Sequence, residues 1–346
     1  MKKRRLIIVL GVHRSGTSAI TKGLETMGVS LGHHLIAPNL YNEKGYWEDA
    51  DFHRLNLEML NAFEDRLRRI LPVSEEEILT LETHGYFQQA SELLHRKIQQ
   101  YPLYGIKDPR FSLLLPFWKK VFATCHVEPS FIIALRNPLN VAACQEQFRN
   151  QHREKSLWIW ISYLLSCLHH SEGYERIIVD YDELLKNPTH QMKRLSKKFS
   201  LPLHPEVLYS YSCDFLDPSL RHFYGNEENR LEQSFCYSFA LEIYHKLLHV
   251  AKEKISFSEL KPFLRKWNDQ FFPLESLLIL EEKNNHRLHH LMKAHEQLHH
   301  KNTEQLKTII ELNKTVMEKL KLAADLSQII EQKNRQLALL NQKFSS

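Results

Sequence analysis

The 346-residue sequence lacks the features that mark several classes of protein. Its five cysteines are odd in number and never occur as Cys-x-x-Cys, which argues against a disulfide framework or a zinc site and favours a reducing compartment. No run approaches the roughly 18 apolar residues of a membrane span. The apolar run after Arg5 is too short for the core of a signal peptide. We therefore expect a cytoplasmic protein that does not span a membrane.

Neither sign of charge dominates. The formal net charge is +5, which by itself argues neither for nor against a nucleic-acid partner, and we expect none. The 21 histidines are scattered or occur as His-His pairs, without metal-ligand spacing beside cysteines. No acidic cluster suggests a magnesium site, so we expect no metal. Hydrophobic residues at 43% are typical of a globular protein.

Proline and glycine are absent from residue 274 to the end, which predicts one long helix. A 3–4 repeat runs through it, and twelve of its seventeen positions are apolar, which is typical of a coiled coil and favours a homodimer. The alternative is an amphipathic helix folded back on the globular part. The repeat comprises Leu288, Leu291, His295, Leu298, Asn302, Gln305, Ile309, Leu312, Val316, Lys319, Ala323, Leu326, Ile330, Lys333, Leu337, Leu340 and Phe344.

The first half of the chain alternates short apolar strands with helices, which predicts an α/β fold with a parallel sheet flanked by helices. The expected strands are 6–10, 101–106, 130–135 and 176–180. We expect one domain over residues 1–270, with helical elements at 200–270, and the long helix over 274–346.

A glycine-bracketed loop between the first strand and the first helix has the layout of a phosphate cradle, like a P-loop. The spacing from Gly11 to Gly16 is that of a Walker A motif, but Thr17 stands where that motif has Lys. The nearest cation is Arg14, inside the loop. The sequence therefore predicts a phosphate loop that does not serve a nucleoside triphosphate.

Basic residues recur after the predicted strands. Lys107 and Arg110 follow the second strand, and Arg136 follows the third. Ligands of parallel sheets bind outside the carboxyl ends of the strands. We therefore expect an anion site at this edge.

The segment Gly11–Ser18 resembles the 5′-phosphosulfate loop of sulfotransferases that use 3′-phosphoadenosine-5′-phosphosulfate (PAPS), in the bacterial branch that reads His-Arg-Ser-Gly-Thr-Ser. Further blocks over roughly residues 5–225 resemble that branch in the same order. They begin at Asn42, Lys107, Arg136, Leu157, Tyr181 and Leu216, the last ending at His222.

The resemblance implies a PAPS site. Arg14 and the backbone N–H groups that follow it would hold the phosphosulfate, and Arg136 would hold the 3′-phosphate. The family's partner of that arginine is a serine, and here the position is Cys144, whose thiol is a weak donor. The implied binding residues are Arg14, Ser15, Gly16, Thr17, Ser18, Arg136 and Cys144.

The resemblance also implies in-line transfer of a sulfonyl group from PAPS to a hydroxyl, less readily an amine, of a glycan, glycolipid or small molecule. Arg14 and Lys107 would stabilise charge, and Glu48 is our first candidate for the general base, ahead of Asp49 and His53. Glu48 could instead stabilise the N-terminus of the helix expected at 50–63.

Two other functions fit parts of the sequence. One is a P-loop kinase or NTPase, although Thr17 and the lack of a Walker B acid before Arg136 count against it. The other is a non-catalytic coiled-coil scaffold with a degenerate nucleotide-binding fold, which Cys144 would fit.

Overall fold

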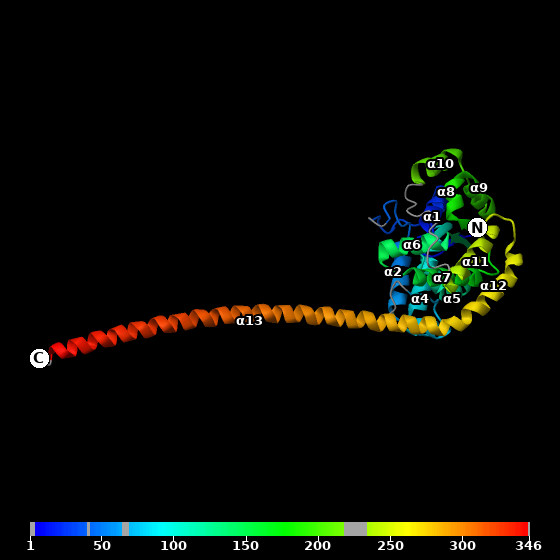
Figure 1. Cartoon of the computed structure of the whole chain (residues 1–346). Helices are drawn as coiled ribbons and strands as arrows, with labels where there is room; N and C mark the ends of the chain where they lie inside the picture. Colours follow the sequence, from blue (N-terminus) through cyan, green and yellow to red (C-terminus); the bar gives the residue numbers. More distant parts are fainter. Residues whose placement is uncertain (1–3, 40–41, 64–68, 218–233, 345–346) are drawn as a thin grey trace. The chain divides into compact units, whose positions relative to one another are not determined.

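A computed structural model describes residues 4–39, 42–63, 69–217 and 234–344. It divides into two compact units, residues 1–282 and 283–346. The first, whose helices are labelled in Figure 1, is built around a four-stranded parallel sheet of order β2-β1-β3-β4. The strands are β1 (Arg5–Leu10), β2 (Leu103–Lys107), β3 (Pro129–Leu135) and β4 (Arg176–Asp180), so the four predicted strands are confirmed.

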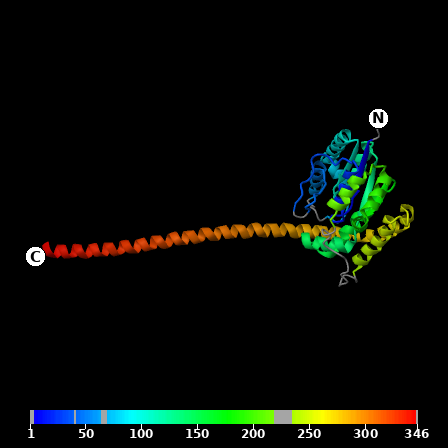
Figure 2. The same ribbon diagram turned by 90° about the horizontal axis from the view of Figure 1, so that it is seen from above.

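Helices cover both faces of this sheet (Figure 2), as the α/β prediction requires. They are α1 (Thr17–Thr26), α2 (Ala50–Asn61), α3 (Glu75–Thr83), α4 (Tyr86–Gln100), α5 (Phe111–Thr124), α6 (Pro138–Arg149), α7 (Arg153–His170), α8 (Tyr181–Lys186), α9 (Pro188–Phe199), α10 (Pro205–Ser210), the π-helix η1 (Tyr211–Phe215), α11 (Phe235–Ala251), α12 (Phe257–Phe271), the 3₁₀ turn η3 (Phe272–Leu274) and α13 (Glu275–Phe344).

Alternation along the strands sends side chains into two separate cores. Leu6 and Ile8 of β1 join the larger core, with residues of α2, α4, α5, α7, α11 and α12. Ile7 and Val9 face the opposite way and pack with α1, α9 and η1. Because the sheet is buried on both faces, its strands are almost continuously apolar.

Local signals in the sequence set several helix ends. Ser74 and Glu77 form the capping box that begins α3. Trp160 belongs to the larger core and is 1% exposed, and Trp158 packs partly buried against the same core. The five cysteines are free thiols.

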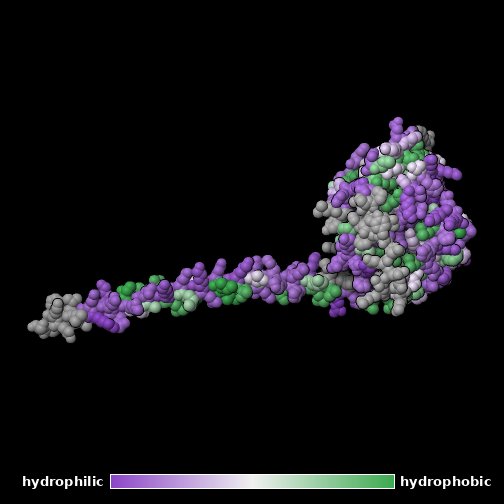
Figure 3. Space-filling view, turned by 45° about the horizontal axis from the view of Figure 1, so that its top comes forward, coloured by the Kyte–Doolittle hydropathy of each residue, from purple (hydrophilic) through white to green (hydrophobic). Residues whose placement is uncertain are grey.

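The predicted long helix is present as α13, which begins at Glu275 and has 70 residues. Its apolar side chains are interspersed with polar ones along its surface (Figure 3), and Leu298, Ile309 and Val316 of the repeat are each more than half exposed. In the part of the chain that the structure describes, no helix is both long and apolar enough to cross a membrane.

Candidate functional site

The loop between β1 and α1 follows the centre of the sheet and has an unusual backbone. Gly11 has φ of 142° and Gly16, the N-cap of α1, has φ of 85°. An added Cβ on Gly16 would lie 2.1 Å from Cδ2 of Tyr181. Arg14 also has a left-handed backbone, with φ of 70°, which a non-glycine residue adopts at a cost. The backbone N–H groups of the first helical turn have no intrahelical acceptor, so this end of α1 can receive an anion.

The predicted loop residues divide into two groups. Arg14, Gly16, Thr17 and Ser18 line a pocket. Ser15 is 1% exposed, and its Oγ donates to the carbonyl of Val12 at 2.6 Å, so its side chain supports the loop from within.

Arg136, from the end of β3, reaches the same loop. One terminal nitrogen donates to the carbonyl of Arg14 at 2.7 Å, and the guanidinium lies 4.9 Å from the ring centroid of Tyr181. Arg136 lines the pocket and is 6% exposed, and its Nε is buried without a hydrogen-bond partner. Burial lowers the pKa of Arg136 from its ordinary value. A buried guanidinium with an unused donor is suited to bind an anion.

Cys144 lies on α6, 1% exposed, and is not one of the residues that line the pocket. Its Sγ accepts a hydrogen bond from Nε of Arg14 at 2.9 Å. The guanidinium of Arg14 also lies 5.0 Å from the ring centroid of Phe148. Cys144 and Phe148 therefore position Arg14.

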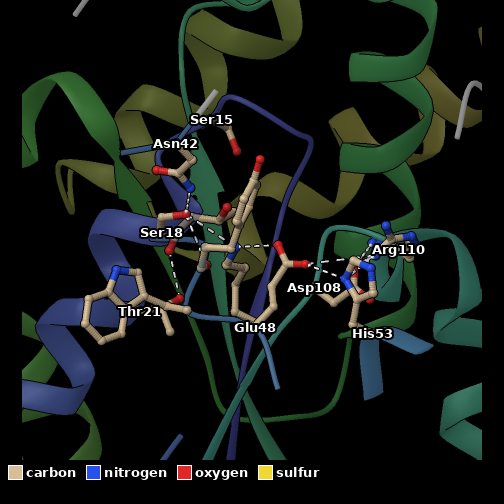
Figure 4. Close-up of polar contacts among 12 residues, drawn as sticks. Ser15, Ser18, Thr21, Asn42, Glu48, His53, Asp108 and Arg110 are labelled. Carbon is tan, nitrogen blue, oxygen red and sulfur yellow. Dashed lines mark hydrogen bonds and ion pairs between the residues drawn. The ribbon is translucent and has the colours of Figure 1, made fainter. Parts of the chain in front are cut away.

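Ser18, Lys107 and Glu48 form a chain of polar contacts beside the loop. Ser18 and Glu48 are labelled in Figure 4. Nζ of Lys107 lies 3.3 Å from Oγ of Ser18 and 2.7 Å from Oε1 of Glu48, and Nδ2 of Asn42 donates to Ser18 at 3.2 Å. Lys107 is 2% exposed and Glu48 is 5% exposed, although both reach the pocket.

The second oxygen of Glu48 contacts His53 of α2. Oε2 lies 2.9 Å from Nδ1 of His53, and that Nδ1 is 3.2 Å from a terminal nitrogen of Arg110. Burial raises the pKa of Glu48, but the charge of Lys107 and the hydrogen bonds from His53 and Lys107 outweigh it and hold the pKa at about 2. Glu48 is therefore a carboxylate at neutral pH, and both its oxygens are engaged.

Asp49 has a structural role. Its Oδ1 accepts from the backbone N–H of Asp51 and caps α2, and its Oδ2 contacts Nζ of Lys97 at 2.5 Å and the hydroxyl of Tyr104 at 2.7 Å. Asp49 is not one of the pocket-lining residues.

One group among the described residues has ligand atoms close enough for a metal ion. Atoms of Glu48, His53 and Asp108 lie within 4.8 Å of one another, a cluster that the sequence analysis did not identify. However, Lys107 pairs with Glu48, and Arg110 pairs with Asp108 at 2.9 Å. Cations already occupy the positions beside these carboxylates, which disfavours a metal ion between them.

The pocket beside the phosphate loop has a volume of about 660 Å³, within the usual range for small-molecule sites. Cations outnumber acids in its lining. The basic residues are Arg14, Lys44, Lys107, Arg110, Arg136 and Arg149, and the acidic residues are Glu43, Glu48 and Asp217. Such a pocket favours an anionic ligand.

His13 and Arg149 are among the pocket-lining residues that the sequence analysis did not predict. His13 lies between the two glycines of the phosphate loop, and this position in the sequence could have identified it as a pocket residue. Arg149 ends α6, far from any strand end, and no sequence pattern pointed to it. The block from Leu216 to His222 reaches the pocket through Leu216 and Asp217, and residues 218–222 lie outside the described residues.

No family model and no curated protein matches this chain. Among solved structures, the chain is similar to the sulfotransferase domain of the Synechococcus PCC 7002 olefin synthase, at 13% identity and a TM-score of 0.42 over 71% of this chain and 96% of that one. It is also similar to sulfotransferase STF9 from Mycobacterium avium, at 16% identity and a TM-score of 0.36 over 78% of each chain. It is also similar to the sulfotransferase domain of the curacin biosynthetic pathway, at 15% identity and a TM-score of 0.36 over 61% of this chain and 79% of that one. Because the identities and the TM-scores are low, the function has to be inferred from the residues that line the pocket.

Proposed function

We propose that this protein is a sulfotransferase that transfers a sulfonyl group from PAPS to an acceptor hydroxyl. The observation that carries the proposal is the meeting of three basic groups in one pocket: Arg14 in the phosphate loop, Lys107 from β2 and Arg136 from β3. They lie beside a carboxylate–imidazole pair, Glu48 and His53.

Two anionic groups of PAPS can be assigned to this lining. The 5′-phosphosulfate would lie against Arg14 and the N–H groups of Gly16, Thr17 and Ser18. The 3′-phosphate would lie against the guanidinium of Arg136, which lines the pocket. Because Cys144 already accepts from Arg14, it contributes by holding Arg14 rather than by donating to the 3′-phosphate.

In the transfer, the acceptor oxygen attacks sulfur, the bond from sulfur to the 5′-phosphate oxygen breaks, and the nucleotide 3′-phosphoadenosine 5′-phosphate (PAP) leaves. Arg14 and Lys107 stabilise the charge that develops on the leaving oxygen. No metal ion is needed for these steps, because the cations are supplied by side chains.

The acceptor's proton passes to the pair formed by Glu48 and His53. A carboxyl with a pKa of about 2 is a weak base at neutral pH, so Glu48 is better suited to orient His53 than to take the proton alone. When Nδ1–H of His53 donates to Glu48, its Nε2 is available to accept the proton.

A ligand comparison tests the donor site. We expect PAP to raise the melting temperature of the full chain, since a ligand at 100 times its Kd adds about 2.7 kcal/mol. 5′-AMP, which lacks the 3′-phosphate, should stabilise the chain much less. The proposal is overturned if PAP at millimolar concentration gives no stabilisation.

The same experiment separates the other two functions. A P-loop kinase or NTPase would be stabilised by Mg-ATP and would hydrolyse it, with activity lost in Arg14→Ala. A scaffold with a degenerate nucleotide fold would respond to neither ligand. Sulfonate transfer by the wild type above the level of Glu48→Gln excludes the scaffold.

We also propose that α13 pairs with α13 of a second copy as a coiled coil. Residues of the repeat that are described in the structure, such as Leu298, Leu312 and Leu326, expose half or more of their surface. An exposed stripe that is apolar at twelve of its seventeen positions is stabilised by a matching stripe, and an identical helix supplies one.

A further inference from the structure

Trp47 has a backbone conformation that its own side chain disfavours. Its φ is 58°, in the left-handed region, where a bulky residue is a rare outlier. Such conformations persist only where the surrounding structure holds them, and they gather at functional sites. The unusual residue directly precedes Glu48, a member of the proton-accepting pair under the proposed function, on which this inference rests.

The left-handed turn connects two anchored stretches of backbone. Before it, the carbonyl of Tyr46 accepts a hydrogen bond from Oγ of Ser18 on α1 at 3.2 Å. After it, the carbonyl of Glu48 accepts from the backbone N–H of Ile36 at 2.9 Å. Trp47 is the single residue between these two anchors, so its backbone angles set the direction in which the chain reaches Glu48. A change of φ at Trp47 would move Glu48 relative to α1 or break one of the two hydrogen bonds.

The indole ring of Trp47 makes three contacts with other parts of the chain. Its Nε1–H donates to the carbonyl of Lys44 at 2.9 Å. Nζ of Lys22, on α1, lies 4.5 Å from the centre of the ring. The ring of Phe215, from η1, meets it edge to face, with the ring centroids 6.1 Å apart. A cation over an indole and an edge-to-face aromatic pair are both favourable, so these contacts offset the cost of the left-handed backbone.

We infer that Trp47 is a positioning residue, whose ring contacts hold the left-handed backbone that directs the Glu48 carboxylate to Lys107 and His53. Oε1 of Glu48 lies 2.7 Å from Nζ of Lys107, and Oε2 lies 2.9 Å from Nδ1 of His53 (Figure 4). Contacts of this kind need placement to within about 0.5 Å, which a rotation of the backbone at Trp47 would exceed. Trp47 acts through Glu48, because Tyr46 and Glu48 line the pocket and Trp47 between them does not.

Three substitutions at this position separate the backbone conformation from the ring. Trp47→Gly removes the ring but accepts the left-handed backbone, whereas Trp47→Ala removes the ring and disfavours that backbone. Trp47→Phe keeps an aromatic ring and loses the indole N–H. If the backbone conformation is what matters, glycine should disturb Glu48 less than alanine does. A residue that matters through packing alone would be disturbed at least as much by glycine, because glycine removes more of the side chain.

Crystal structures of the full-length variants with PAP show the position of Glu48 directly. In Trp47→Gly and Trp47→Phe, we expect the carboxylate to keep its contacts with Lys107 and His53, and in Trp47→Ala to lose at least one of them. The transfer rate gives a second readout, with p-nitrophenyl β-D-glucoside as the acceptor probe, because its hydroxyls need a base. The rate should fall about 10²-fold in Trp47→Ala, as for a misplaced catalytic group, while the Kd for PAP stays within about twofold.

The inference is overturned if Glu48 keeps both contacts in Trp47→Ala, or if Trp47→Gly displaces the carboxylate as far as Trp47→Ala does. Trp47→Gly also decides alone if Trp47→Ala does not fold, since displacement of Glu48 in the glycine variant contradicts the inference. A loss of PAP binding of about tenfold in Trp47→Ala would place Trp47 in the donor site instead. Failure of the proposed function looks different, because the wild type would then not bind PAP, while the position of Glu48 in crystals without PAP would still report on Trp47.

Discussion

At the scale of single residues, Arg136 connects the end of β3 to the phosphate loop and keeps one buried nitrogen without a partner. We predict that Arg136→Gln weakens PAP binding by about 10- to 100-fold, which corresponds to the 1.5–3 kcal/mol of a charged hydrogen bond. Binding of 5′-AMP should change much less. Calorimetric titration of both nucleotides measures the difference, and an equal loss for both would show that Arg136 serves only the fold of the loop.

Glu48 and His53 are joined by one hydrogen bond and should act as a unit. We predict that Glu48→Gln and His53→Gln each lower the transfer rate by about 10²- to 10⁴-fold, the usual contribution of general base catalysis. PAP binding should persist in both variants.

The double variant should be no slower than the worse single variant, because each change disables the same proton transfer. Rates measured by PAP release test this non-additivity. If the rate losses of the two single variants multiply in the double variant, Glu48 and His53 act in separate steps.

Asp180 at the end of β4 is buried, with one oxygen capping α8 and the other without a hydrogen-bond partner. Burial is the main reason why the pKa of Asp180 rises from 3.8 to about 6. The folded protein therefore binds this proton more tightly than the unfolded chain, so stability is lost as the pH rises from about 4 to 6. Above pH 6, the loss is on the order of 2–3 kcal/mol.

We predict that Asp180→Asn removes this loss while keeping the cap acceptor. The variant should be more stable than the wild type by about 2 kcal/mol at pH 7.5 and no more stable at pH 4. Urea unfolding at the two pH values measures the change. The explanation fails if the free energies of unfolding of the variant and the wild type differ by the same amount at both pH values.

At the scale of elements, the loop between β1 and α1 depends on the close contact between Gly16 and Tyr181. We predict that Gly16→Ala abolishes PAP binding, because a Cβ would lie 2.1 Å from the ring and would displace either the loop or Tyr181. Gly28→Ala is the matched control. Gly28 has φ of 81°, nearly the same as Gly16, but its added Cβ would meet its nearest atom at 3.9 Å.

Gly28→Ala should therefore show the cost of the left-handed backbone alone, about 1–2 kcal/mol of stability, and retain PAP binding. Thermal unfolding with and without PAP separates the two effects. If both variants bind PAP equally, the contact with Tyr181 does not shape the site.

Elements were predicted best where the signal is local. The four strands and the start of α13 follow from apolar runs and from the absence of proline and glycine. The role of Asp49 could not be read in this way. Its partners Lys97 and Tyr104 come from α4 and β2, about 50 residues away, and only their packing shows that Asp49 is structural.

At the scale of the whole molecule, the proposed dimer depends on which side of α13 is apolar. We predict that Ile309→Asp with Val316→Asp converts a dimer into a monomer in light scattering, because both positions lie on the repeat. Ile310→Asp with Met317→Asp is the control, since these neighbours are as exposed, at 60% and 68%, but lie off the repeat. The control should remain a dimer. If the two pairs behave alike, the repeat does not mediate association.

The sequence by itself determined the order of the elements, the glycine-bracketed loop and the basic residues at the strand ends, because each depends on neighbours within a few positions. Only the tertiary structure decided which of these residues share a pocket. Cys144 supports Arg14, Glu48 has its pKa lowered by Lys107, and Arg149 reaches the site from the far end of α6. The physical reason is that burial and charge pairing depend on residues distant in the chain, and packing alone brings them together.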